Sequence, residues 1–383
     1  MKDSIFHQFN LKTPAYVYDT EKIINVLEIM NKIQEDSSCF LLYSIKSANN
    51  IGLLELIKPY VNGFSCSSIF ELQLAKEILD SKQTVHISTP GFNKNELNKL
   101  STLSDFITLN SITQLNNFSD EIKTKSSCGI RINPELSFVS DDRFDPCRSF
   151  SKLGIPLTYL YEDKNFNNID WSVIDGIHVH NNCESINFDE MRQTISKIML
   201  VLKQHQIELK WFNLGGGYLI DSGNDFLPLV DTIRWLQDNF SVDVYFEPGK
   251  AVTGNAGYLI ASVIDLFRNG GEQIAILDAS INHLPEVFEY QYQPKVMYSQ
   301  DITDYKYHLA GSSCLSGDLF GEYCFEDPLE LGSLVVFENV GAYMQVKANM
   351  FNGINLPSIY LLDENSNFRL LKEYDYNSFR DRL

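Results

Sequence analysis

The stretch Phe40-Leu41-Leu42-Tyr43-Ser44-Ile45-Lys46 opens with an apolar run and ends on a lysine. A short apolar run of this kind is typical of a buried β-strand. Lys46 then stands at the carboxyl end of the strand, where α/β barrels carry their reacting groups. An amine that is partly desolvated there has a lowered pKa and becomes a nucleophile for imine formation, although most lysines are solvated surface charges.

Similar apolar runs recur along the first two thirds of the chain. They lie at residues 61–66, 84–87, 106–109, 129–132, 176–180, 211–214 and 242–246. Amphipathic helical stretches lie between most of them, for example at 51–57, 69–79, 191–203 and 227–240. Eight strands that alternate with helices predict an α/β fold, a TIM-like parallel (β/α)8 barrel.

The pattern changes after Gly249. Strand-like segments at 263–267, 274–277, 306–310 and 333–337 follow one another with little helical periodicity, which predicts an all-β domain. The segment Ala15–Tyr18 is also strand-like and could pair with this domain. We therefore expect a barrel over residues 20–250 and a β domain built from residues 1–19 and 251–383. The polar segment Ser137–Cys147 is the best candidate for a mobile loop.

Composition narrows the class of protein. The 383 residues are 44% apolar, as in ordinary globular proteins, and carry a formal net charge of −19. That charge argues against a nucleic-acid partner and is compatible with a cationic substrate. The seven cysteines show no metal-binding spacing, which indicates reduced thiols and no metal site. Without an apolar signal core or a membrane-length apolar run, we expect a cytoplasmic protein away from membranes.

Two motifs follow the last two barrel runs. Leu214-Gly215-Gly216-Gly217-Tyr218 lets the backbone approach an anion such as phosphate, although a plain turn would look the same. Phe246-Glu247-Pro248-Gly249-Lys250 places a carboxylate at the barrel mouth. Glu247 could pair with the nitrogen of a heterocyclic cofactor, or belong to the first turn of a helix.

Two further segments carry reactive side chains. His178 and His180 alternate, so on a strand they face the same side. No third metal ligand is evident; we favour His180 for ring stacking and place His178 deeper and hydrogen-bonded, while two core histidines remain the alternative. Cys314, between small residues, is either a catalytic acid or an inert packing group.

Taken in order, these motifs resemble a known superfamily. Lys46 in a Y-x-x-K segment, His180, the triple glycine, Glu-Pro-Gly, Cys314-x-x-x-Asp318 and Gly341-Ala342-Tyr343 resemble the fold-type III pyridoxal-phosphate decarboxylases. That group has an alanine racemase-like fold and includes ornithine, arginine and diaminopimelate decarboxylases. The resemblance runs from Thr13 to Pro357.

Within that group the chain looks most like the carboxynorspermidine/carboxyspermidine decarboxylases. The segments that carry this likeness are Asp145–Arg148 with Ser151–Ile155, Asn182–Glu184, Leu277–Glu289, Cys314–Asp318 and Val346–Gly353. The chain departs from the relatives at four places, of which Asn181-Asn182 and Gly341-Ala342 differ from the nearest family. The other two are Leu315 and Lys250. Leu315 replaces the acid that diaminopimelate and ornithine decarboxylases carry, and Lys250 stands where the carboxynorspermidine enzymes usually have Glu.

The resemblance implies a role for each motif. Lys46 would bind pyridoxal 5'-phosphate covalently, Glu247 would pair with its ring nitrogen, and Cys314 would donate a proton from the partner subunit. The other cofactor-binding residues that it implies are Arg131, His180, Gly215, Gly216, Gly217, Gly249, Lys250 and Tyr343. The substrate-binding residues that it implies are Cys183, Glu184, Asp278, Glu286 and Asp318.

The function that the resemblance implies is decarboxylation of a carboxylated polyamine in spermidine biosynthesis, by a homodimer with shared active sites. Three alternatives stay open. They are a related decarboxylase acting on another aminopropyl-type amino acid in specialised metabolism, a diaminopimelate or ornithine decarboxylase, and a non-catalytic pyridoxal-phosphate-binding pseudoenzyme. A racemase is disfavoured, because racemases pair the ring nitrogen with Arg and Glu247 holds that position here.

Overall fold

The computed structural model describes residues 11–383 except residue 222. These residues divide into a barrel unit (25–46 and 54–251) and a sheet unit (residues up to 24, 47–53 and 252–383). The division differs from the expected one because the first turn of one helix and the segment after Lys46 pack with the sheet unit. The part of the expectation that concerns residues 1–10 lies outside the described residues.

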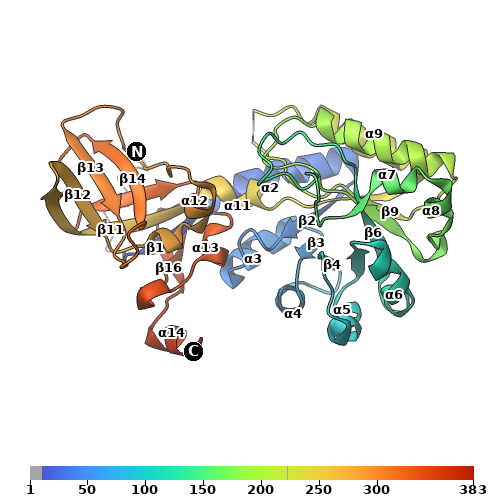
Figure 1. The fold of residues 1–383 in the computed structure, drawn as a ribbon, viewed down its shortest axis with the longest axis horizontal. Helices are drawn as coiled ribbons and strands as arrows, with labels where there is room; N and C mark the ends of the chain where they lie inside the picture. The colour runs from blue at the N-terminus through green and yellow to red at the C-terminus, as the bar shows by residue number, and fades with distance from the viewer. Residues whose placement is uncertain (1–10, 222) are drawn as a thin grey trace. The chain divides into compact units, whose positions relative to one another are not determined.

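In the described part of the barrel unit, eight parallel strands close on themselves, which confirms the predicted (β/α)8 barrel (Figure 1). Pairing runs in chain order, and the first and last strands pair to complete the ring. A short strand β7 (Ile155–Pro156) adds to β6 outside the ring. The barrel strands are β2 (Phe40–Ser44), β3 (Gly63–Cys66), β4 (Thr84–Ser88), β5 (Phe106–Leu109), β6 (Ser127–Asn133), β8 (Gly176–His178), β9 (Trp211–Asn213) and β10 (Asp243–Phe246).

Helices form where apolar residues recur every three or four positions. In α9 the buried side chains include Met191, Ile195 and Ile198, which share one face. Ser68 begins α4 by accepting a hydrogen bond from the Glu71 amide. The helices that start in or belong to this part of the chain are α2 (Thr20–Ser37), α3 (Ile51–Ile57), α4 (Ile69–Ile78), α5 (Leu97–Leu103), α6 (Ile112–Lys123), α7 (Leu157–Leu160), α8 (Asp163–Asn167), α9 (Asp189–Gln204), α10 (Leu227–Phe240) and α11 (Lys250–Thr253).

Aromatic side chains fill the barrel interior near the start of the strands. Trp211 and Tyr245 are buried with Leu42, and Phe40 and Phe106 pack against them. The Phe106 and Trp211 rings meet edge to face at 5.7 Å between centroids. Because this layer closes the amino-terminal end of the barrel, chemistry is confined to the carboxyl ends of the strands.

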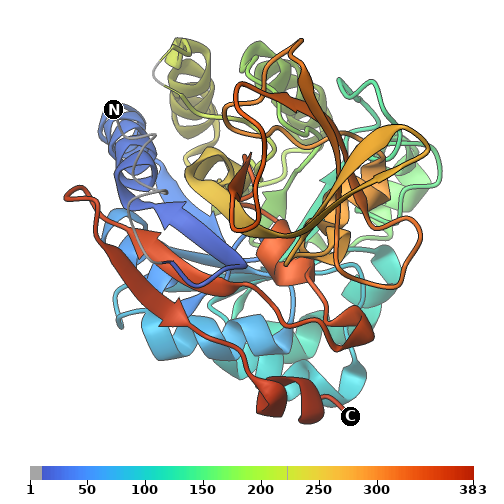
Figure 2. The same ribbon diagram turned by 90° about the vertical axis from the view of Figure 1, so that its left-hand side faces the viewer.

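The sheet unit is built mainly of strands, as the change of pattern after Gly249 predicts. The amino-terminal strand β1 lies between β11, to which it is antiparallel, and β16, to which it is parallel. Figure 2 shows β1 in blue beside the red C-terminal strands. The strands and α-helices of the sheet unit are β1 (Ala15–Asp19), β11 (Gly257–Asn269), β12 (Glu272–Leu277), β13 (Tyr305–Ala310), β14 (Leu319–Phe325), β15 (Leu334–Glu338), β16 (Ser358–Leu362), β17 (Phe368–Lys372), α12 (Pro285–Tyr290), α13 (Met344–Lys347) and α14 (Tyr376–Arg380).

Two further expectations concern the chain as a whole. Across residues 11–383, residue 222 apart, no helix combines the length and the apolar character that crossing a membrane requires. The segment 137–147 forms no helix or strand and is held by short-range contacts, such as the one between the Cys147 amide and the Asp145 carboxylate at 2.7 Å. Its mobility stays a prediction.

Candidate active site at the barrel mouth

The strand register brings three polar side chains into one row inside the barrel. Arg131 of β6 pairs with His178 of β8, which pairs with Asn213 of β9. Residues in register on parallel strands point to the same side, so Arg131, His178 and Asn213 lie next to one another; we call them the polar row. Two residues earlier along the strands, Gly129 and Gly176 leave room for the Trp211 ring, which a Cβ at Gly176 would meet at 2.0 Å.

Glu247 follows β10 and turns its carboxylate toward the polar row. Asn213 Nδ2 donates to its Oε1 at 2.7 Å, and His178 Nε2 lies 3.4 Å from its Oε2. Burial would by itself raise the pKa of Glu247, but His178, the Asn213 amide and Lys46 together hold that pKa well below its ordinary range. The buried carboxylate is therefore a fixed negative charge.

Lys46 follows β2 on the side that faces the interior, because it continues the alternation of Leu42 and Ser44. Its side chain reaches solvent at the barrel mouth, while the surrounding protein reduces its hydration. Desolvation by the surrounding protein lowers the pKa of Lys46, Glu247 opposes that shift and Arg131 adds to it. More of the amine is therefore neutral and nucleophilic at a given pH than in a solvated lysine.

The glycine loop supports the site with its backbone amides. The Gly215 amide donates to Asn213 Oδ1 at 2.8 Å and the Gly216 amide to His180 Nδ1 at 3.0 Å. The Gly217 amide makes no hydrogen bond to any described residue and sits at a φ of 91°, which favours glycine. Two of the three amides therefore position side chains, and the third has no partner among the described residues.

The two histidines differ from the expectation in one respect. β8 ends at His178, so His180 lies just beyond the strand. His178 is the deeper one, at 2% exposure, and its Nε2 lies 3.4 Å from Glu247 Oε2. That His178 is hydrogen-bonded stays a prediction. Burial lowers the pKa of His180 well below its usual value, and the neighbouring Lys46 adds to the shift, so its ring is neutral.

Lys250 begins α11, directly after the Glu-Pro-Gly turn, and forms an ion pair. Its Nζ lies 2.5 Å from Glu184 Oε1. Glu184 has a φ of 56°, and its neighbour Cys183 is partly buried. Gly249 precedes the pair. The positive charge of Lys250 is therefore matched by an acid from the segment that follows β8.

Several of the predicted site residues belong to the sheet unit. The first three are Cys314, Asp318 and Tyr343. Cys314 is exposed, and its amide donates to Asn352 Oδ1 at 2.8 Å. Asp318 is buried and accepts the amides of Ile281 and Ser313, so its carboxylate holds the cysteine loop together. The Tyr343 amide donates at 2.7 Å to the carbonyl of Ser47, which follows Lys46 in the chain.

The other two predicted substrate residues also have partners within the sheet unit. Asp278 accepts hydrogen bonds from Thr13 Oγ1 at 2.5 Å and the Ser262 amide at 2.8 Å. Glu286 lies 3.0 Å from Lys347 Nζ. These contacts stabilise the unit itself, and the substrate-binding roles of Asp278, Glu286 and Asp318 stay predictions.

The sequence did not single out Asn213 or Glu71. Asn213 precedes the glycine loop and shares a face with Trp211, which is the one signal that could have indicated an inward amide. Glu71 lies on α4, where its carboxylate accepts the Ser67 amide at 2.5 Å. Burial raises the pKa of Glu71, and the nearby charge of Lys46 opposes that shift.

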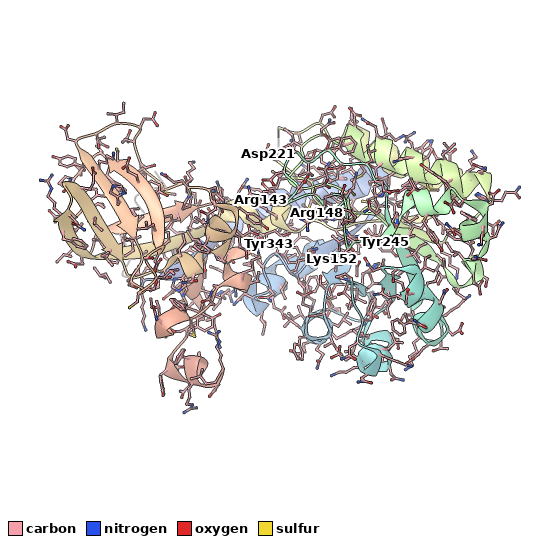
Figure 3. The ribbon with its side chains drawn as sticks, in the orientation of Figure 1. Arg143, Arg148, Lys152, Asp221, Tyr245 and Tyr343 are labelled. Atoms are coloured by element: carbon pink, nitrogen blue, oxygen red, sulfur yellow. The ribbon has the colours of Figure 1, made fainter. Side chains whose placement is uncertain are left out.

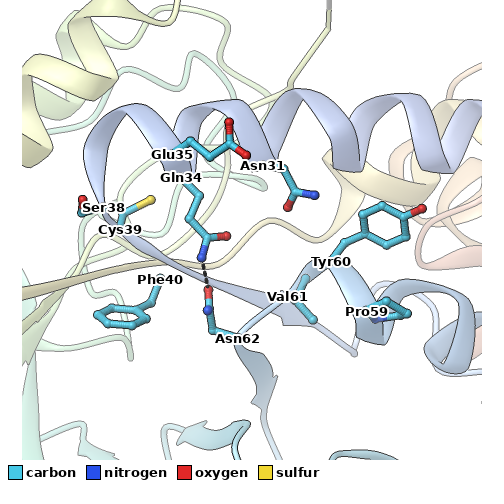
Figure 4. A pocket seen from close by; sticks show the side chains of 10 residues that line it. All are labelled: Asn31, Gln34, Glu35, Ser38, Cys39, Phe40, Pro59, Tyr60, Val61 and Asn62. Carbon is cyan, nitrogen blue, oxygen red and sulfur yellow. Dashed lines mark hydrogen bonds between the residues drawn. The ribbon is translucent and has the colours of Figure 1, made fainter.

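Two other groups of polar residues have partners of their own. A cavity of about 610 Å³ opens where β2 and β3 begin, at the amino-terminal end of the barrel, where Gln34 donates to Asn62 (Figure 4). Arg143, Arg148 and Lys152 come from the segment between β6 and β7 (Figure 3). There Arg143 pairs with Asp141 at 2.7 Å and Arg148 donates to the Asp142 carbonyl at 3.2 Å, so these charges serve the segment itself.

Comparison with known proteins agrees with this geometry. Residues 15–341 match the family described as pyridoxal-dependent decarboxylase, C-terminal sheet domain. A carboxynorspermidine/carboxyspermidine decarboxylase from Campylobacter jejuni is 32% identical, over 96% of this chain and 98% of its own. A carboxyaminopropylagmatine decarboxylase from Synechocystis is 31% identical, over 98% of this chain and 96% of its own.

A solved structure extends the likeness to three dimensions. The crystal structure of carboxynorspermidine decarboxylase from Campylobacter jejuni, complexed with norspermidine, superposes with a TM-score of 0.87 at 31% identity, and the match covers 97% of this chain and all of that one. The match to the family spans most of the chain and includes the strand ends that carry Lys46, His180 and Glu247. The chain therefore belongs to the pyridoxal-dependent decarboxylases with a C-terminal sheet domain.

Proposed function

We propose that this enzyme removes a carboxyl group, as carbon dioxide, from carboxynorspermidine or carboxyspermidine with the help of pyridoxal 5'-phosphate. The observation that carries the proposal is the set of Lys46, the buried charge of Glu247 and the glycine loop at one end of the barrel. Similarity at about the same identity to two decarboxylases of carboxylated aminopropyl amines supports the choice of substrate class.

The residues present fit this cofactor. The Gly217 amide is a donor for its phosphate, and a Cβ at Gly216 would meet the Glu247 carbonyl at 2.4 Å, so the loop accepts only glycine at that close approach. Lys46 supplies the amine for covalent attachment, His180 the stacking ring and Glu247 the partner of the ring nitrogen. When bound, pyridoxal phosphate supplies an electron sink for the electron pair that carbon dioxide leaves behind.

The chain's own groups then control charge and protons. Glu247 keeps its negative charge inside the protein, which favours a protonated ring nitrogen beside it. Arg131 stays charged at neutral pH, because burial lowers its pKa only to about 10, and its guanidinium donates to the His180 carbonyl at 3.4 Å. The exposed thiol of Cys314 is the proposed donor of the proton that replaces the carboxyl group.

The charges near Lys250 support a cationic substrate. An unpaired lysine at that position would favour an anionic substrate tail, but Glu184 neutralises it. Leu315 stands at the position where, by the resemblance, diaminopimelate and ornithine decarboxylases carry an acid. Carboxyaminopropylagmatine is the second candidate substrate, since one relative of nearly equal identity is named for it.

The test of this function is carbon dioxide release from carboxynorspermidine, measured together with mass spectrometry of the amine product. Wild type should produce norspermidine, and Lys46→Ala should abolish turnover. Borohydride reduction should attach the cofactor to the peptide that contains Lys46 in wild type only. Turnover by Lys46→Ala at the wild-type rate would refute a pyridoxal mechanism.

We also propose that two copies of the chain share their active sites, with Cys314 reaching the partner's barrel. Mixing inactive Lys46→Ala with impaired Cys314→Ala should restore part of the activity, because a mixed dimer contains one intact site. A lack of recovery after demonstrated subunit exchange would mean that each site is built from one chain.

A further inference from the structure

Two side chains enclose the carboxylate of Glu247. Asn213 Nδ2 donates to Oε1 at 2.7 Å, while His178 Nε2 stands 3.4 Å from Oε2. Asn213 is 1% exposed, His178 2% and Glu247 8%, so water does not screen these contacts. Each oxygen of one buried carboxylate therefore faces a different partner.

The barrel register fixes this arrangement. His178 and Asn213 are paired residues on neighbouring strands β8 and β9. Asn213 in turn pairs with Tyr245 of β10, and Glu247 follows two residues later, just after that strand ends. Asn213 Oδ1 also accepts the Gly215 amide at 2.8 Å. Asn213 therefore joins the glycine loop to the acid with both ends of its amide.

His178 is less easily explained by packing. Both of its ring nitrogens are buried, and apart from the 3.4 Å contact between Nε2 and Glu247 Oε2 neither has a polar partner among the described residues. An unsatisfied buried polar group costs stability, and an apolar side chain of similar size would avoid that cost. The other titratable groups that act electrostatically on this carboxylate or on His178 are Lys46, Arg131, His180, His86 and Cys66. Among the residues that the structure describes, His178 alone lies within ion-pair distance of the carboxylate.

We propose that Asn213 and His178 are positioning residues for Glu247: Asn213 occupies Oε1 and fixes the carboxylate plane, and His178 borders Oε2 and keeps it directed at the ring nitrogen of the cofactor. This inference rests on the proposed function only for the identity of that cofactor. Neither residue touches the reacting atoms, so their loss should weaken cofactor binding and lower kcat rather than raise KM.

The experiment compares His178→Leu, His178→Gln and Asn213→Leu with wild type. The matched control is His86→Phe, which replaces another buried imidazole of the barrel. Its ring stacks on Phe106 at 4.0 Å and its Nε2 lies 3.2 Å from Thr84 Oγ1, so its charge interaction with Glu247 and His178 involves no hydrogen bond or ion pair to either. For each protein we would measure the Kd of pyridoxal phosphate for the apo form, the absorption spectrum of the bound cofactor, the melting temperature, and kcat and KM with carboxynorspermidine.

We expect His178→Leu and Asn213→Leu to lower kcat about tenfold, with KM changed by less than about twofold, and to raise the cofactor Kd about tenfold. His178→Gln keeps an N–H near the position of Nε2 and should recover about half of the lost affinity and rate. His86→Phe should stay within about twofold of wild type in cofactor Kd, kcat and KM.

The proposal is overturned if His178→Leu and Asn213→Leu match His86→Phe in cofactor Kd and kcat. It is also overturned if His178→Gln is no better than His178→Leu while their melting temperatures fall equally, because the role of His178 would then be structural. The cofactor titrations need no substrate. If wild type binds the cofactor and fails to decarboxylate carboxynorspermidine, the proposed substrate fails, and the Kd values still decide the positioning roles.

Discussion

Glu247 keeps a negative charge in the barrel although it is almost fully buried. An isolated carboxylate would be neutralised there by a raised pKa, since charge is costly in a low dielectric. Its neighbours reverse that outcome, because the Asn213 amide, the His178 ring and the Lys46 amine all favour the ionised form. The charge of this one side chain is therefore a property of the whole polar surrounding.

Replacing Glu247 by Gln removes the charge with little change in shape. We expect kcat with carboxynorspermidine to fall about tenfold or more, which corresponds to about 1.4 kcal/mol of activation free energy, because a neutral amide cannot favour the protonated ring. Single-turnover kinetics measure the chemical step directly.

Glu322→Gln is the control for this measurement, since Glu322 is an exposed acid of the sheet unit paired with Lys306 at 2.7 Å. It should react at the wild-type rate. An unchanged single-turnover rate in Glu247→Gln would contradict the role assigned to the carboxylate.

The strands β6, β8 and β9 place small, large and polar residues in matching rows. Gly129 and Gly176 lie in one row with Trp211, and the polar row follows two residues later. The indole needs the space above the two glycines, and its Nε1 donates to Ser127 Oγ at 2.8 Å. The apolar row thus supports the polar row that carries the site.

Gly176→Ala tests this support. The new Cβ would lie 2.0 Å from the Trp211 ring, so the ring or the strand has to move. Overpacking of this kind costs about 1–3 kcal/mol of the free energy of unfolding, which urea denaturation measures. Gly91→Ala is the matched control, because nothing lies within 4 Å of its added Cβ, and it should change stability by less than about 0.5 kcal/mol. Equal stability of the two variants would contradict the packing described for β8.

Much of this architecture could be predicted from the chain. The apolar runs at Phe40, Phe106 and Trp211 begin where the strands begin, because each is short, buried and bounded by polar turn residues. The roles of His178 and Asn213 could not be predicted, since they depend on which residues of β8 and β9 stand in register. Single sequences contain periodicity within a strand and carry little information on register between strands.

Each of the two units buries a histidine as a neutral ring, and the whole protein should show this as acid sensitivity. Burial lowers the pKa of His86 in the barrel to about 3 and that of His283 in the sheet unit to about 4. Both rings are neutral in the folded protein, whereas the unfolded chain binds protons below about pH 6.5. Stability should therefore fall as pH drops from 7 toward 4.

The contribution of His86 can be separated by substitution. When the pH falls from 7 to 5, proton binding by His86 in the unfolded chain should lower the free energy of unfolding of wild type by up to about 2 kcal/mol. His86→Phe keeps the stacking against Phe106 and has no proton to bind, so its loss over the same range should be smaller by that amount. Urea unfolding at the two pH values measures the difference, and equal losses in the two proteins would show that His86 is not buried as a neutral ring.

The central claim, a decarboxylase for carboxylated triamines, is tested most directly by kcat/KM for carbon dioxide release from a set of substrates. The set comprises carboxynorspermidine, carboxyspermidine, carboxyaminopropylagmatine, diaminopimelate, ornithine and lysine, each with the same pyridoxal-phosphate-loaded enzyme. We predict that carboxynorspermidine or carboxyspermidine exceeds diaminopimelate, ornithine and lysine by at least about a hundredfold, or about 2.7 kcal/mol of transition-state stabilisation. A higher kcat/KM for diaminopimelate or ornithine, or no carbon dioxide release from any of the carboxylated polyamines, would contradict it.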